Sequence, residues 1–219
     1  MKNKIEKGAD PSNPYNLDII STLERYRESI EESSHNSLVD LEIVIPGVEL
    51  DIRYATENNF TGKKIYTKPK AWLRKGAAEA LKKINRELNN EGLAIKIFDA
   101  YRPYAASLFF YEVYPDTNYV AAPWVGSIHN RGAAVDLTLI DLSDGNELAM
   151  PTPFDDFTEK AHHTYSNLTQ EESANRFKLL TVMERYGFER FQTEWWHYNF
   201  ISETPYPLMD ISFDQLDSF

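Results

Sequence analysis

Two short segments of the chain carry the residue types that can hold a metal ion and move a proton. The first runs from Ser127 to Asp136 and contains His129, and the second runs from Glu194 to His197. The chain has no Cys, so a metal ion here must be held by His and carboxylate side chains. We therefore examined whether these segments supply a complete ligand set.

His129 and Asp136 are seven positions apart, with Gly132 between them. On a straight strand their side chains would point to opposite faces. If His129 lies in a loop and Gly132 turns the backbone into a strand, both side chains can converge on one metal ion. Alone, the segment fits a loop histidine and a solvated or capping aspartate as well, so the metal hypothesis needs a further ligand.

The second segment supplies that ligand together with a base. The three-residue spacing lets Glu194 take a proton from water while His197 binds the metal ion. Taken alone, the segment also fits two core tryptophans, a histidine bonded to a backbone carbonyl and an exposed glutamate. With both segments, His129, Asp136 and His197 leave the fourth position of zinc for water, which distinguishes a catalytic from a structural site.

The other histidines lie in polar segments. His35 is in the stretch 31–37, and His162 and His163 stand near an expected helix boundary. We expect these three side chains at the surface rather than at a metal.

Hydrophobic spacing predicts the elements that must position these residues. Helices are expected over 16–32, over the segment containing Ala77 to Leu88, from Pro103 through Tyr111, and from a capping box at Thr169 and Glu172 to Gly187. Strands are expected over 41–45, 48–53, 93–98, 133–140, 188–191 and 195–201. Without regular βαβ alternation, this order predicts an α+β domain with a largely antiparallel central sheet and flanking helices.

Length and chemistry suggest three parts within one folded unit. Residues 1–40 would form an N-terminal helix and linker, 41–201 the catalytic domain, and 202–219 an acidic tail packed on the surface, since it has Pro205 and Pro207 and no base. Arg102 is expected at a strand-to-helix junction.

Composition excludes some partners. The formal net charge of -11 at pH 7 argues against nucleic acid and anionic membranes, because clustered Lys and Arg carry such binding. No run approaches the roughly 18 apolar residues of a membrane span, and residues 1–10 have no apolar signal segment. We expect a cytoplasmic protein, or a periplasmic or exported one if a signal peptide was removed. The oligomeric state is open.

The two segments also carry a resemblance. The pattern S-x-H-x-x-G-x-A-x-D of residues 127–136, followed by E-x-x-H of residues 194–197, resembles the D-Ala-D-Ala metallopeptidase superfamily. Three further landmarks, in family order, resemble its dipeptidases of the VanX type, in peptidase family M15: Asp99-Ala100-Tyr101-Arg102-Pro103, Tyr54-Ala55-Thr56 with Asn59-Phe60-Thr61-Gly62, and Pro153-Phe154-Asp155-Asp156-Phe157. The landmarks extend from about Val48 to Phe200.

This resemblance implies a fold like that of hedgehog and the D-Ala-D-Ala peptidases, and one Zn2+ per chain on the His129, Asp136 and His197 side chains. It implies Glu194 as general base and then acid, and Arg102 as the group that stabilises the tetrahedral intermediate. Without the resemblance, Arg102 fits a salt bridge to Asp99 or a helix-entry contact as well.

Two substrate contacts follow from the resemblance alone. Ser127 would contact the substrate backbone, and Asp155 would bind its free amino group. A cap or turn explains Asp155 and Asp156 about equally well.

The implied function is a zinc-dependent D,D-dipeptidase that hydrolyses the small peptide D-alanyl-D-alanine with metal-activated water, in antibiotic resistance or in cell-wall recycling. One alternative is a D,D-carboxypeptidase or endopeptidase that acts on longer peptidoglycan peptides. Another is a zinc-bearing binding module without activity, since fold and metal alone do not establish catalysis.

Overall fold

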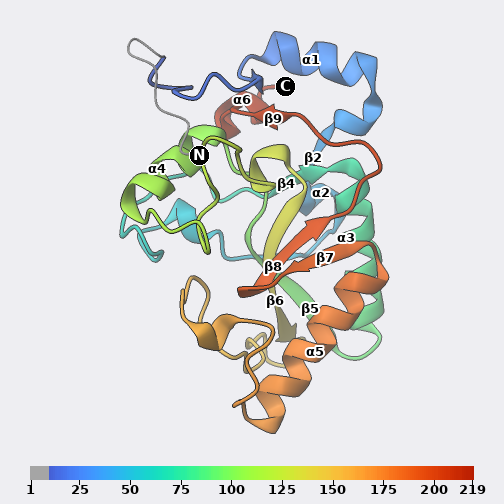
Figure 1. The fold of residues 1–219 in the computed structure, drawn as a ribbon. Coiled ribbons are helices and arrows are strands. Elements are labelled where there is room, and N and C mark those ends of the chain that lie inside the picture. Colours follow the sequence, from blue (N-terminus) through green and yellow to red (C-terminus); the bar gives the residue numbers. More distant parts are fainter. Residues whose placement is uncertain (1–9) are drawn as a thin grey trace.

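The computed structural model describes residues 10–219, and a five-stranded sheet in the order β3-β5-β6-β8-β7 lies at its centre (Figure 1). The strands are β3 (Glu49–Leu50), β5 (Leu93–Asp99), β6 (Ala134–Asp141), β7 (Phe188–Phe191) and β8 (Glu194–Phe200). β3 runs parallel to β5, and the other neighbouring pairs are antiparallel. This confirms the predicted α+β class with a largely antiparallel sheet.

Two long helices cover the sheet, α3 (Lys75–Asn89) along β5 and α5 (Gln170–Arg185) across β6, β7 and β8 (Figure 1). Both follow the sequence pattern. The apolar stripe of α3, from Ala77 to Leu88, is buried, and the predicted capping box of Thr169 and Glu172 opens α5.

Strand β6 separates the apolar core from the chemistry. Val135, Leu137 and Leu139 belong to the core, together with apolar side chains of α5. Successive side chains of a strand point to opposite faces, so Asp136 and Thr138 face the other way. Both sets are buried, because loops cover the face that carries Asp136.

The N-terminal part differs from the prediction in two places. The expected helix over 16–32 begins later, as α1 (Leu23–Glu32) capped by Thr22, and the residues before it form β1 (Ile19–Ile20). The strand expected over 41–45 is wrong, because this segment is the short helix α2 (Leu41–Val44). The Asp40 side chain accepts the Glu42 N–H, and such a cap outweighs the strand preference of Ile43 and Val44.

Other short elements flank the sheet. They are β2 (Leu38–Asp40) paired with β4 (Trp72–Arg74), α4 (Tyr104–Val113) directly after Pro103, and the 3-10 turns η1 (Ser34–Asn36), η2 (Arg53–Ala55), η3 (His129–Arg131) and η4 (Glu159–Ala161). The strand expected over 48–53 shortens to β3, since η2 follows it. Proline before the first turn of α4 agrees with its lack of an N–H donor.

The C-terminal segment packs more deeply than its acidic composition suggested. It forms β9 (Leu208–Met209), parallel to β1, and α6 (Phe213–Asp217). Its buried side chains are Tyr206, Leu208, Met209, Ile211, Phe213 and Leu216. The acidic residues of the segment are exposed, except Asp210, which is half-buried and accepts the Ala105 N–H. The apolar side chains between them make the segment part of the core.

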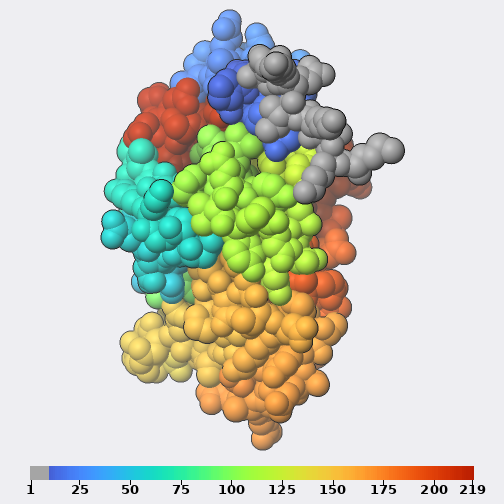
Figure 2. Space-filling model, turned by 60° about the vertical axis from the view of Figure 1, so that its left-hand side comes forward, coloured from blue at the N-terminus to red at the C-terminus, as the bar shows by residue number. Residues whose placement is uncertain are grey.

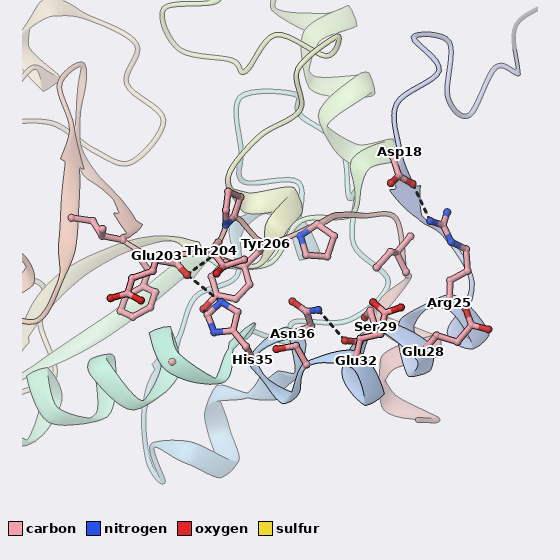
Figure 3. A pocket seen from close by; sticks show the side chains of 18 residues that line it. Asp18, Arg25, Glu28, Ser29, Glu32, His35, Asn36, Glu203, Thr204 and Tyr206 are labelled. Atoms are coloured by element: carbon pink, nitrogen blue, oxygen red, sulfur yellow. Dashed lines mark hydrogen bonds and ion pairs between the residues drawn. The ribbon is translucent and has the colours of Figure 1, made fainter.

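A groove of about 770 Å3 lies between α1 and residues 200–207 (Figure 3). Beside it the imidazole of His35 stacks on Tyr206 at 4.1 Å, and its Nε2 is 3.1 Å from the Ser202 Oγ. His35 therefore attaches the C-terminal segment to the N-terminal one and is not near the candidate metal ligands.

The division into 1–40, 41–201 and 202–219 stays a prediction, and residues 1–9 of its first part lie outside the described residues. None of the helices within residues 10–219 is long and apolar enough to cross a membrane. The expected cytoplasmic location likewise stays a prediction.

Three segments that are distant in sequence meet on one face of the molecule. Figure 2 shows the cyan, green and orange parts of the chain side by side there. They include the loop with Tyr54 and Phe60, helix α4 with the loop after it, and the loop with Asp155 and Phe157, all of which line one pocket.

Gly132 offers a test of the turn that leads into β6. Its φ is +66°, and a Cβ there would lie 2.5 Å from a methyl group of Leu38. We expect Gly132→Ala to lower the free energy of unfolding by about 1–2 kcal/mol for the left-handed backbone, and by about 1–3 kcal/mol more for the clash. Urea denaturation measures the sum of these two losses.

The matched control is Gly145→Ala, where φ is +74° and nothing lies within 4 Å of the added Cβ. It should show the backbone cost alone. Equal losses in the two variants would contradict a tight contact between Gly132 and Leu38.

Candidate metal centre and pocket

The register of the sheet places three polar residues side by side. Asp99 on β5 is opposite Asp136 on β6, and Asp136 is opposite His197 on β8. Residues directly opposite in antiparallel strands point to the same face, with Cβ atoms about 4.5–5.5 Å apart. The sheet itself therefore brings Asp136 and His197 together and sets Asp99 beside them.

His129 reaches the same place from a loop. It begins η3, and Gly132 ends that turn in the left-handed conformation before β6 starts. On a straight strand His129 and Asp136 would point to opposite faces, but the turn over 127–132 lets both side chains reach the same place. His129 and Asp136 are both buried.

The three candidate ligand atoms converge. The His129 Nε2 lies 3.1 Å from the His197 Nδ1 and 3.4 Å from the Asp136 Oδ1, and the last two atoms are 3.0 Å apart. Ligands bound to zinc at about 2.0–2.1 Å in a tetrahedron are about 3.3 Å from one another. The separations fit three corners of such a tetrahedron, and these three residues form the one His, Cys, Asp or Glu triad of this kind within residues 10–219.

The proton positions also suit a metal ion. The His129 Nδ1 donates to the Ala100 carbonyl at 2.6 Å, because a carbonyl only accepts, and this leaves its Nε2 as a lone pair. The Asp136 Oδ1 is buried and has no hydrogen bond of good geometry. A buried acceptor without a donor is costly, and a cation among these atoms would satisfy it.

Glu194 stands next to the triad without belonging to it. Its Oε2 is 3.7 Å from the His197 Nδ1, and its side chain is buried in the pocket wall. Burial raises the pKa of Glu194 to about 8, with Asp136 and Asp155 adding to the rise against His197. A group that binds protons near neutral pH is suited to general acid and base work.

Arg102 makes the salt bridge to Asp99 that the sequence allowed, and it also lines the pocket. Its Nε and Nη2 donate to one oxygen of Asp99 at 3.0 and 2.7 Å, which is the predicted salt bridge. The guanidinium also lines the pocket, 3.8 Å from Asp136 and stacked over the rings of Tyr54 and Phe110. Its orientation is therefore fixed on several sides.

Ser127 and Asp155 both line the same pocket. The Ser127 Oγ accepts the His129 N–H at 3.1 Å, so it shapes the ligand loop. Asp155 has an unusual φ of +62°, and its Oδ1 accepts the Tyr54 hydroxyl at 3.0 Å. The other oxygen is buried without a partner, and burial raises the pKa of Asp155 to about 7.

The pocket around these groups is small and aromatic. Its volume is about 240 Å3. Its apolar walls come from Phe60, Phe110, Tyr119, Val120, Ala121, Phe157, Phe191 and Trp196. Tyr119 stacks on Phe157 at 5.2 Å, so the aromatic loop after α4 borders the site.

The sequence analysis did not predict the positioning roles of three residues. Asn130 is fully buried, accepts the Ser127 N–H, and donates to the Arg102 carbonyl and the Ser107 hydroxyl. Asp99 was considered only as a salt-bridge partner, and Tyr66, which donates to it at 3.0 Å, was not considered. Asn130 stands inside the first segment, but nothing in its spacing indicates which backbone groups it would meet.

The remaining histidines lie outside the centre. His162 is 3.1 Å from the hydroxyl of Tyr119, and His163 is half-buried near Tyr198. Burial lowers the pKa of His163 to about 4. Neither lies with the three candidate ligands.

The chain is similar to known proteins over most of its length. The family model described as D-ala-D-ala dipeptidase (Peptidase_M15) matches residues 34–215. A D-alanyl-D-alanine dipeptidase of Escherichia coli (strain K12) is 38% identical over 81% of this chain and 91% of its own. Proteins with the same description from Enterococcus faecium and Enterococcus faecalis (strain ATCC 700802 / V583) are 33% and 32% identical, over 76% and 78% of this chain and 92% and 95% of theirs.

The contact between Tyr66 and Asp99 can be tested by removing one hydroxyl. Tyr66→Phe leaves an Asp99 oxygen buried without its donor, so we expect the free energy of unfolding to fall by about 1–3 kcal/mol in urea denaturation. Tyr186→Phe is the control, because its hydroxyl bonds Glu87 in solvent, and its effect should be much smaller. Equal effects would mean that Asp99 does not depend on Tyr66.

Proposed function

The chain belongs to the D-Ala-D-Ala dipeptidase family, and from this premise we propose that it hydrolyses D-alanyl-D-alanine with one bound zinc ion. The observation that carries the proposal is the convergence of two imidazoles and a carboxylate beside an unliganded glutamate, inside a pocket of about 240 Å3. The family membership and this arrangement point to the same reaction.

The donor set suits zinc. His129 Nε2, Asp136 Oδ1 and His197 Nδ1 would hold the ion, leaving a position for water or substrate. Bound zinc supplies Lewis acidity to the scissile carbonyl and lowers the pKa of water.

Glu194 would handle the proton. Its carboxylate accepts a proton from the water that attacks the peptide carbonyl, and it then delivers that proton to the leaving amine nitrogen. The raised pKa of the buried carboxyl suits both transfers, since it accepts and releases protons near neutral pH.

Arg102 would stabilise the charge that develops on the carbonyl oxygen. Asp99 occupies its Nε and Nη2, while its Nη1 has no hydrogen bond to a residue of the described chain. That remaining donor belongs to a side chain that lines the pocket, so it is available to a substrate oxygen. The ion pair with Asp99 holds it in place before substrate arrives.

Asp155 would select the substrate amino group. Its unpartnered oxygen belongs to a carboxyl in the pocket wall, and the Tyr54 hydroxyl fixes the other oxygen. An ammonium group supplies the hydrogen-bond donor that this oxygen lacks. An acylated amino terminus offers fewer donors and adds bulk. Ser127 lines the same pocket and would contact the substrate backbone.

The shape of the pocket favours a dipeptide over longer wall peptides. A carboxypeptidase or endopeptidase needs a long cleft. Here Phe157 stacks on Tyr119 and meets Phe60 edge-on, and these three rings line the pocket wall. A binding module without activity would not need the buried Glu194 and Arg102, which cost free energy to desolvate.

The role of Glu194 predicts a specific loss. Glu194→Gln should retain zinc and fold but lose at least about 10²–10⁴-fold in kcat, because the amide cannot accept the proton. Glu112→Gln, an exposed residue of α4, is the matched control and should equal the wild type. Steady-state hydrolysis of D-Ala-D-Ala and metal analysis measure the two properties, and near-normal turnover of Glu194→Gln would place the base elsewhere.

The role of Asp155 predicts discrimination by substrate length. We expect the wild type to cleave D-Ala-D-Ala but to lose about 10²-fold or more in kcat/KM on N-acetyl-D-Ala-D-Ala and on a pentapeptide that ends in D-Ala-D-Ala. Asp155→Asn should narrow this ratio by weakening dipeptide hydrolysis, whereas Asp156→Asn, outside the pocket lining, should keep it. Equal or better cleavage of the longer peptides would favour the carboxypeptidase or endopeptidase.

A further inference from the structure

We infer that Asn199 is a positioning residue that fixes the tautomer and the ring orientation of His197. The inference rests on the proposed function, because it concerns how His197 is prepared for the metal ion. Asn199 belongs to none of the motifs of the sequence, and it does not contribute a ligand atom to the triad.

Strand geometry brings the two side chains together. His197 and Asn199 are both in β8 and two positions apart, so they point to the same face of the sheet. Their opposite residues on β6 are Asp136 and Ala134. The small side chain of Ala134 leaves space beside Asn199, and the Asn199 Oδ1 lies 2.9 Å from the His197 Nε2.

This contact determines where the imidazole proton sits. A neutral imidazole carries one proton, and an amide oxygen can only accept a hydrogen bond. The proton is therefore on Nε2, pointing to Asn199, and Nδ1 keeps its lone pair. That lone pair is on the atom that lies 3.0 Å from Asp136 and 3.1 Å from the second imidazole. The same contact orients the ring and gives the tautomer that metal binding needs.

The two histidines depend on side chains to different degrees. His129 is oriented by a backbone carbonyl, that of Ala100, and its side chain is 2% exposed. His197 is 12% exposed and is oriented by a side chain, with the ring of Phe191 beside it at 5.3 Å. Water can reach the less covered ring, so its orientation depends more on Asn199.

The Asn199 variants separate this role from a structural one. Asn199→Leu has a side chain of similar size without an acceptor, and Asn199→Val also lacks the acceptor and suits a strand. Asn199→Asp keeps an acceptor in either orientation, whereas an amide can turn its NH2 group to the imidazole. Zinc affinity is measured by competition with a chromophoric chelator, and the melting temperature of the metal-free protein is measured in parallel.

We expect Asn199→Leu and Asn199→Val to bind zinc about 10–100-fold more weakly, which is the usual effect of losing a partner of a ligating histidine. Asn199→Asp should bind at least as tightly as the wild type. When loaded with cobalt(II), Asn199→Leu and Asn199→Val should also show a visible spectrum that differs from that of the wild type. The ligand field changes because the His197 ring is held less firmly.

Wild-type zinc affinity in both apolar variants would overturn the inference while leaving the proposed function intact. A weaker affinity that follows an equal loss of metal-free stability in all three variants, including Asn199→Asp, would assign Asn199 a structural role and would also overturn it. A wild-type protein that binds no zinc would overturn the proposed function and the inference together.

Discussion

The structure depends on a row of polar side chains, two of them buried and one half-buried, that crosses three neighbouring strands. Asp99, Asp136 and His197 are opposite one another on β5, β6 and β8, because backbone hydrogen bonds set their register. Burying two carboxylates is costly unless cations or donors compensate them. Arg102 and a tyrosine hydroxyl compensate Asp99, while Asp136 faces two imidazole nitrogens and retains an acceptor that the proposed metal ion would satisfy.

The two faces of the sheet have different roles. Helices α3 and α5 and the apolar side chains beneath them supply a core, and we expect a core of this size to fold without the metal. The opposite face carries the reactive groups, and Asn130 ties its loops by bonding the backbone of Ser127 and of Arg102. Groups held in this way need little rearrangement when substrate binds, which is how preorganised sites lower a barrier.

Residue types and spacing predicted the class of fold, the main helices and the convergence of His129, Asp136 and His197. They could not predict contacts that depend on how distant segments pack. The partners of Asn130 come from segments of the chain that no local pattern connects. The helix at 41–44 was missed because a single cap, Asp40, decided between two weak preferences. The depth of the C-terminal segment was missed because its acids and its two prolines suggested a surface tail, although most of its apolar side chains are buried.

The central claim is that these three side chains hold one zinc ion at the pocket, and a crystal structure of the zinc-loaded protein tests it most directly. Data collected on both sides of the zinc absorption edge locate the ion independently of any assumption about its ligands. The account predicts one anomalous peak per chain, at about 2.0–2.2 Å from His129 Nε2, Asp136 Oδ1 and His197 Nδ1. A peak elsewhere, or one that Glu194 coordinates in place of a histidine, would contradict it.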